Sequence, residues 1–133
     1  MDPILQTSPQ ASYVSHRAEI EASLHRVLNS GCYILGEEVA SFENEFAKHM
    51  SVSYAIGVAS GTAAVELALR ACEVGSGDLV FTVAHTAVAT VAAIELCGAT
   101  PVLLDVDPAS YTMDAECLRN ALQDHPPGRP RAV

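Results

Sequence analysis

Two stretches in the first fifty residues carry apolar side chains at helical spacing. The spacing predicts helices over residues 15–29 and 37–50, because positions three and four apart lie on the same face of a helix. The apolar face consists of Ile20, Leu24, Val27 and Leu28 in the first stretch, and of Val39, Phe42, Phe46 and Met50 in the second. Gly31 follows the first stretch, and a glycine at this position is typical of a helix end.

Beyond residue 50, short continuous apolar runs alternate with helix-forming stretches. The runs predict buried strands at 54–58, 79–83 and 101–104, and the stretches predict helices at 63–72, 86–97 and 114–123. Alternation of strand and helix is typical of a mainly parallel sheet with right-handed crossovers. Continuous apolar strands favour a sheet that is covered by helices on both faces. The sequence therefore predicts an α/β fold.

The last residues indicate an incomplete sheet. After the turn-rich segment 125–130, the chain reads Arg131-Ala132-Val133, where the alternation requires a fourth strand. We therefore expect this polypeptide to be the N-terminal part of a longer protein, with a truncated sheet. An unfilled edge exposes unpaired backbone groups, so the chain alone should be marginally stable or prone to self-association.

Composition narrows the classes of function. Sixteen acidic against seven basic residues give a formal net charge of -9, which argues against nucleic-acid binding and against docking on an anionic membrane. The sequence shows neither an export signal nor a membrane span, so a cytoplasmic protein is expected. The four cysteines lack CxxC spacing and no HExxH pattern occurs, so no metal site is predicted.

The residues Ser60-Gly61-Thr62 stand between a predicted strand and a predicted helix. The first amides of a helix have no partner within it, and together with the helix dipole they form an anion site. Gly61 would let a ligand approach the backbone, and Ser60 and Thr62 add hydroxyl groups. From the local pattern alone, the plainer interpretation that both hydroxyls only cap the helix is favoured, because Ser and Thr are preferred there anyway.

Several short motifs resemble, in order and at matching spacing, the DegT/StrS-type sugar aminotransferases, which are fold type I enzymes dependent on pyridoxal 5'-phosphate (PLP). The resemblance runs from about Glu19 onward. It rests on the segments 31–39, 42–43, 54–64, 77–78, 86–90, 98–102 and 105–108. Each motif is weak by itself, and their shared register makes the signal specific.

The resemblance implies the N-terminal part of an aspartate aminotransferase-like major domain, with an N-terminal arm over residues 1–14 and an incomplete PLP-binding domain over 15–133. It implies transfer of an amino group, from an amino acid that is usually glutamate, to a keto group on a nucleotide-linked sugar. The expected partners are that nucleotide-sugar, the amino-acid donor and a second copy in a homodimer. The family's Ser-Gly-Thr segment binds the cofactor phosphate, which places Ser60, Gly61 and Thr62 at PLP.

Two departures from the family pattern concern the cofactor ring. Ala87 stands where the family often has an aromatic residue that stacks on PLP, and alanine has no ring face. His85, two residues earlier, is the candidate to supply an imidazole instead, and an ordinary solvent-exposed loop histidine is the alternative. The only lysine, Lys48, lies on the polar side of an early helix. We therefore predict no catalytic residue in this chain, because the Schiff-base lysine and the pyridine-binding carboxylate lie downstream in the family.

Two other functions stay open from the sequence. Some relatives of the family replace the Schiff-base lysine with histidine and dehydrate sugars, and others act as regulators. A non-enzymatic α/β module that binds a phosphorylated metabolite through Ser60–Thr62 is the alternative outside the enzyme class.

Overall fold

The structure is a computed structural model that describes residues 6–133. The chain divides into two compact units, residues 1–57 and 58–133. The division of the sequence into an arm and an incomplete domain stays a prediction. Among the residues described, no helix combines the length and the apolar character that crossing a bilayer requires.

The described part of the first unit forms helices. They are α1 (Pro9–Ser15), α2 (Arg17–Ser30) and α3 (Glu37–His49). The predicted helix over 15–29 therefore corresponds to α2, and α1 precedes it because His16 leaves the helical conformation (φ -115°, ψ 20°). Gly31 ends α2 with a left-handed φ of +69°, which confirms the predicted helix stop.

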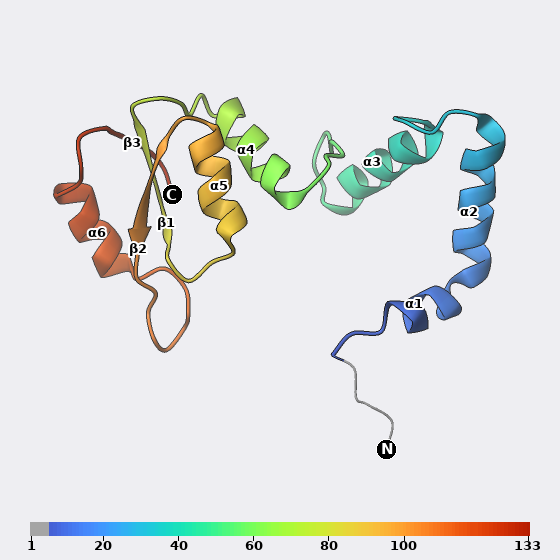
Figure 1. Cartoon of the computed structure of the whole chain (residues 1–133), viewed down its shortest axis with the longest axis horizontal. Helices are drawn as coiled ribbons and strands as arrows, with labels where there is room; N and C mark the ends of the chain where they lie inside the picture. The colour runs from blue at the N-terminus through green and yellow to red at the C-terminus, as the bar shows by residue number, and fades with distance from the viewer. Residues whose placement is uncertain (1–5) are drawn as a thin grey trace, which may run out of the picture. The chain divides into compact units, whose positions relative to one another are not determined.

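The second unit alternates helices and strands (Figure 1). Its elements are α4 (Gly61–Ala71), β1 (Asp78–Val83), α5 (Val88–Leu96), β2 (Thr100–Leu104), α6 (Ala115–Gln123) and β3 (Arg129–Ala132). The strand order is β2-β1-β3, and β1 is parallel to both neighbours. The predicted parallel sheet is confirmed, including a strand at the end of the chain. The side chain of Asp114 caps α6 by accepting from the amide of Glu116 at 2.7 Å.

The core lies on both faces of β1, because successive side chains of a strand point to opposite faces. Leu79 and Phe81 pack with Leu104 and with side chains of α6. Val80 points to the other face and packs with Ile94 of α5 and Leu69 of α4. Figure 1 shows α6 on one side of the sheet and α5 on the other. Burial on both faces explains why successive residues of β1, from Leu79 to Phe81, are apolar, and it confirms the predicted cover of helices.

The predicted strand over residues 54–58 is wrong. The structure has no strand there, and Tyr54 and Ile56 are 85% and 80% exposed. An apolar run becomes a strand only when another strand satisfies its backbone groups. Every strand of the sheet comes from residue 78 onward, and none of them pairs with this segment. The junction at Ser60 therefore joins an irregular segment to α4, in place of a strand.

An ion pair between the buried Asp78 and the exposed Arg129 joins β3 to β1. Asp78 is 3% exposed, and its carboxylate accepts from Arg129 Nε at 2.8 Å and from the Gly75 amide at 3.0 Å. The bond from Arg129, followed by the Gly75 amide, lowers the pKa of Asp78 below its usual value. The Arg129 amide also donates to the Gly77 carbonyl at 2.9 Å. These contacts hold the first residue of β3 at the amino end of β1.

Candidate functional site

The first turn of α4 presents backbone donors at the position that the sequence singled out. Ser60 is the N-cap residue, in extended conformation, and its hydroxyl accepts from the Ala63 amide at 3.2 Å. Its carbonyl accepts from the Ala64 amide at 3.0 Å. Ser60 therefore does cap the helix, as the plainer interpretation predicts. The Ser60 hydroxyl satisfies the amide of Ala63, the third in the helix, and leaves the first two amides available.

Those first two amides belong to Gly61 and Thr62. Within residues 6–133 neither amide has an acceptor, which is the usual state of the first turn of a helix. Gly61 is exposed and Thr62 is half-buried. A Cβ built on Gly61 would meet no atom within 4 Å, so the space beside Gly61 is open. The helix runs for 11 residues behind it, and its dipole adds attraction for an anion of roughly 0.3–1 kcal/mol.

His85 and Ala87 lie in the loop that follows β1. Both residues are exposed. Ala87 is the N-cap of α5, and it makes no capping bond through its side chain. Its methyl group has no ring face, so the structure leaves the predicted stacking position without an aromatic residue. The loop begins at the carboxyl end of β1, where ligands bind in parallel sheets.

The two groups of predicted site residues lie at the amino ends of α4 and α5, two helices that pack on the same face of the sheet. Arg70 of α4 donates to the Leu96 carbonyl at the end of α5 at 2.6 Å, and Cys97 Sγ contacts the Glu66 carbonyl at 3.5 Å. The C-terminal halves of α4 and α5 are thus held together. Figure 1 shows the first turns of both helices directed away from that junction. The structure records no direct contact between Gly61 or Thr62 and His85 within the residues described.

A second loop at the carboxyl edge was not predicted as part of the site. The segment 105–114 follows β2, and its tip carries Tyr111, whose ring centroid lies 6.3 Å from that of His85. Asp107 organises the tip by accepting from the amides of Ser110 and Ala109 at 2.8 and 2.9 Å. The Ser110 amide, followed by the Ala109 amide, lowers the pKa of Asp107. The only signal in the sequence was the position of Asp105 and Asp107 at a strand end.

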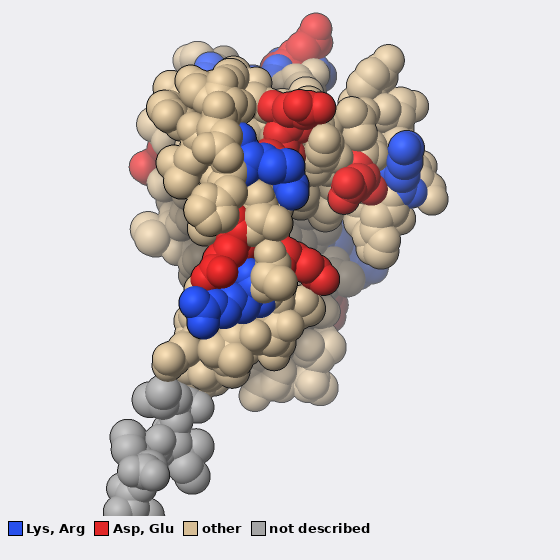
Figure 2. Space-filling view, turned by 90° about the vertical axis from the view of Figure 1, so that its right-hand side faces the viewer, with Lys and Arg blue, Asp and Glu red and all other residues tan. Residues whose placement is uncertain are grey.

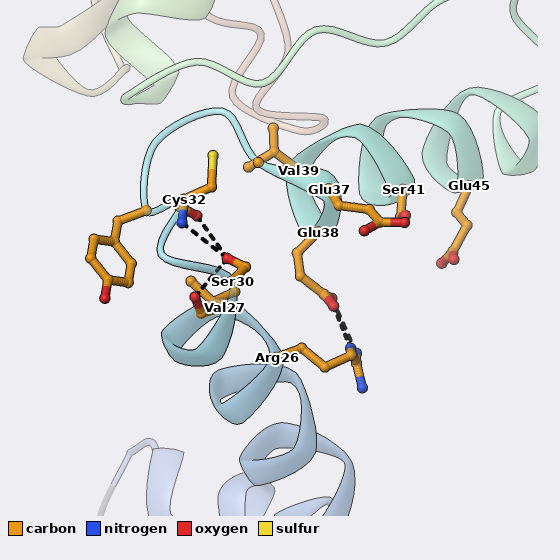
Figure 3. Close-up of a pocket in the computed structure, with 11 residues that line it drawn as sticks. Arg26, Val27, Ser30, Cys32, Glu37, Glu38, Val39, Ser41 and Glu45 are labelled. Carbon is orange, nitrogen blue, oxygen red and sulfur yellow. Dashed lines mark hydrogen bonds and ion pairs between the residues drawn. The ribbon is translucent and has the colours of Figure 1, made fainter.

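The first unit holds a separate hollow of about 550 Å³ between α2, α3 and their connection. Figure 3 shows Arg26 directed toward Glu38 across it; Arg26 Nη2 lies 3.2 Å from Glu38 Oε2. The bond from Arg26 lowers the pKa of Glu38. Beyond this pair, the hollow is lined by Glu37, Glu45 and uncharged residues. It contains none of the residues that the sequence predicted for a site.

Charge does not mark a site on the face that Figure 2 draws. Basic and acidic side chains lie next to one another there, among uncharged residues that cover most of the surface. Surface pairs such as Arg17–Glu21, at 2.8 Å, contribute little to stability because water screens them. Lys48 is exposed in the last turn of α3, which agrees with the prediction of a surface lysine.

Comparison with known proteins links the fold to its relatives. A transaminase from Aneurinibacillus thermoaerophilus, named for dTDP-3-amino-3,6-dideoxy-alpha-D-galactopyranose, is 44% identical over 99 residues, which are 74% of this chain and 27% of that protein. A DegT DnrJ EryC1 StrS aminotransferase structure from Brucella abortus has a TM-score of 0.90 at 32% identity over 98% of this chain and 36% of that one. The structure of S. venezuelae DesV in complex with a ketimine intermediate has a TM-score of 0.88 at 36% identity, over 99% of this chain and 34% of that one.

This chain thus spans only about three tenths of the length of its curated relatives. The similarity nevertheless covers most of its own residues, in sequence and in structure. The family profile described as the DegT/DnrJ/EryC1/StrS aminotransferase family matches residues 14–126. The chain therefore belongs to the DegT/DnrJ/EryC1/StrS aminotransferase family.

Proposed function

We propose that the chain carries the phosphate-binding part of a PLP-dependent aminotransferase, which moves an amino group from an amino acid, glutamate, to a nucleotide-linked keto-sugar. The observation that supports this most directly is the open first turn of α4, where two amides have no acceptor within the residues described. Family membership and the transaminase relative support the reaction class. We further propose that residues 15–133 form part of the cofactor-binding large domain, and that the complete enzyme is a homodimer.

The residues present fit the phosphate group of PLP. The amides of Gly61 and Thr62 would donate to its oxygens, the Thr62 hydroxyl would add a third donor, and Ser60 would hold the helix end in place. The absence of a side chain at Gly61 lets a tetrahedral dianion approach the backbone. When bound, PLP supplies an electron sink for the carbon that carries the transferred amino group.

The ring of the cofactor has a weaker set of partners in this chain. Ala87 offers only a methyl group, and we propose that the imidazole of His85 takes the place of the aromatic residue. Asp105 and Asp107 stand at the end of β2, and we assign neither to the pyridine nitrogen. The lysine that attaches the cofactor is not proposed within this chain, because Lys48 lies exposed on α3.

The free energy of phosphate binding follows from the number of hydrogen-bond donors at the first turn of α4. A hydrogen bond to a charged group contributes roughly 1.5–3 kcal/mol, and association itself costs several kcal/mol. Three donors at Gly61 and Thr62 therefore fall short of the ~8 kcal/mol that micromolar binding requires. We expect the 133-residue chain to bind the cofactor with a dissociation constant on the order of 1 mM.

The test uses pyridoxamine 5'-phosphate, which has the phosphate and ring of the cofactor but no aldehyde to react with lysine. Its phosphorus NMR signal should shift on titration with the chain. Thr62→Ala should weaken binding by about tenfold or more, through the loss of one charged hydrogen bond. Gly61→Ala should weaken binding without loss of stability, because the added methyl meets no protein atom. Ser76→Ala, an exposed hydroxyl before the amino end of β1, should change nothing.

Two outcomes would contradict the proposal. The first is a wild-type chain that does not shift the phosphorus signal at millimolar concentration. The second is unchanged affinity in both Thr62→Ala and Gly61→Ala, which would leave neither residue a role in binding the phosphate. A further measurement addresses the missing lysine: PLP mixed with the chain should be removed by gel filtration, and cofactor retained covalently on Lys48 would show that the attachment site lies in this chain.

A further inference from the structure

Tyr111 is an unusual residue for its position. Its side chain is 69% exposed, so burial of its ring contributes little to folding. Its backbone adopts a φ of +58°, in the left-handed region that residues other than glycine and asparagine seldom occupy. A large exposed side chain at a strained position is not explained by the stability of the fold. An outlier of this kind is a reason to look for a function.

The loop that carries Tyr111 is held in place at its base and at its tip. At the base of the loop, Val106 bridges to Met113, and Met113 packs against the core beside Phe81. At the tip, the Tyr111 amide donates to the Asp107 carbonyl at 2.8 Å. The Asp107 carboxylate accepts from two further amides of the tip. The direction of the Tyr111 ring is therefore set by a well-supported loop.

The aromatic neighbour of this ring is His85. The two ring centroids are 6.3 Å apart and the planes are inclined by 44°, which lies within the range of attractive tilted aromatic pairs. His85 comes from the loop after β1 and Tyr111 from the loop after β2, and β1 and β2 are parallel neighbours. Figure 1 shows both loops at the same end of the sheet. The contact therefore joins the two loops at the carboxyl edge.

We propose that Tyr111 is a positioning residue, which holds the His85 imidazole in one orientation at the carboxyl edge of the sheet. The effect on ligand binding rests on the proposed function, in which His85 contacts the cofactor ring in place of Ala87. A histidine in an exposed loop samples several rotamers, and ordering it before the ligand arrives lowers the entropic cost of binding. A rigid aromatic partner from the neighbouring loop supplies that order.

Two substitutions separate the ring from the backbone. Tyr111→Gly deletes the ring and suits the positive φ, so the loop should keep its fold. Tyr111→Phe keeps the ring and removes only the hydroxyl. The isotopically labelled 133-residue chain would be examined by NMR, through the ring signals of His85 and the through-space contacts between the two rings. The signals are assigned with His85→Gln.

We expect Tyr111→Phe to retain the ring contacts and the His85 signals of the wild type. Tyr111→Gly should move the His85 signals toward those of exposed histidines such as His49 and average its side-chain couplings. It should also weaken binding of pyridoxamine 5'-phosphate about two- to tenfold. Tyr54→Ala, which removes an exposed ring from the first unit, is the matched control and should leave His85 unchanged.

The inference is overturned if Tyr111→Gly leaves the ring signals and couplings of His85 as they are in the wild type. It is also overturned if His85→Gln weakens ligand binding and Tyr111→Gly does not. A wild-type chain that fails to bind the ligand would contradict the proposed function alone, because the ring signals still decide whether Tyr111 orients His85.

Discussion

Gly128 offers a sharp test of how the last strand is held in the sheet. It precedes Arg129, the first residue of β3, and its φ is +151°. A Cβ built on it would lie 2.7 Å from Leu79 Cδ2, 2.8 Å from Leu79 Cγ and 3.2 Å from the Gly77 carbonyl oxygen. Leu79 is 1% exposed and packs in the core with Phe81 and Leu104, so moving its side chain away would disturb that packing. We therefore predict that Gly128→Ala destabilises the chain severely.

The loss of stability expected for Gly128→Ala has two parts. Inserting a methyl group into a packed core costs roughly 1–3 kcal/mol, and a side chain in a sparsely populated backbone region costs a further 1–3 kcal/mol or so. The sum is about 2–6 kcal/mol. A unit of this size has a free energy of unfolding on the order of 4–11 kcal/mol, from roughly 0.05–0.15 kcal/mol per residue. Gly128→Ala should therefore detach β3 or unfold the second unit.

Gly77→Ala is the matched control, because Gly77 has a φ of +86° and a Cβ there would meet nothing within 4 Å. It should cost only the backbone part, about 1–2 kcal/mol. Urea unfolding followed by circular dichroism measures both variants, and hydrogen exchange of the Arg129 amide reports whether β3 stays attached. If Gly128→Ala were no more destabilising than Gly77→Ala, the steric contact with Leu79 would not hold the strand as the structure indicates.

Two further predictions concern carboxylates. Arg129 lowers the pKa of Asp78 in the folded chain. The ionised Asp78 carboxylate therefore stabilises the fold fully above the ordinary aspartate pKa, and this stabilisation is lost as the pH falls below about 3.8. Urea unfolding at decreasing pH should show this loss of stability. The Asp78→Asn variant should be less stable than the wild type at neutral pH and should not show this additional loss at low pH. Glu43 Oε1 accepts from the Gly57 amide at 2.7 Å, so Glu43→Ala should speed hydrogen exchange of that amide. Glu45→Ala on the same helix is the control, and equal effects of both would exclude a specific bond.

Local chemistry along the chain was enough to place most elements. The helix over 37–49 follows from apolar residues spaced by three and four, and the end of α2 follows from Gly31, which alone adopts φ +69° there without strain. Asp114 caps α6 because a carboxylate placed before a helix accepts from its first amides. The open turn at Gly61 was likewise predictable, since the first amides of any helix lack partners within it. These features depend on neighbours within about four residues.

Other features depend on residues far apart in the chain, and only the tertiary structure decided them. The apolar run over 54–58 has the composition of a strand, but a strand needs the backbone of another one, and the described sheet provides none beside it. Tyr111 meets His85 because β1 and β2 end side by side, and Gly128 is required because Leu79 fills the space where its side chain would be. Periodicity encodes which face of an element is apolar. Which partner meets that face is set by packing, and packing joins residues that the sequence separates.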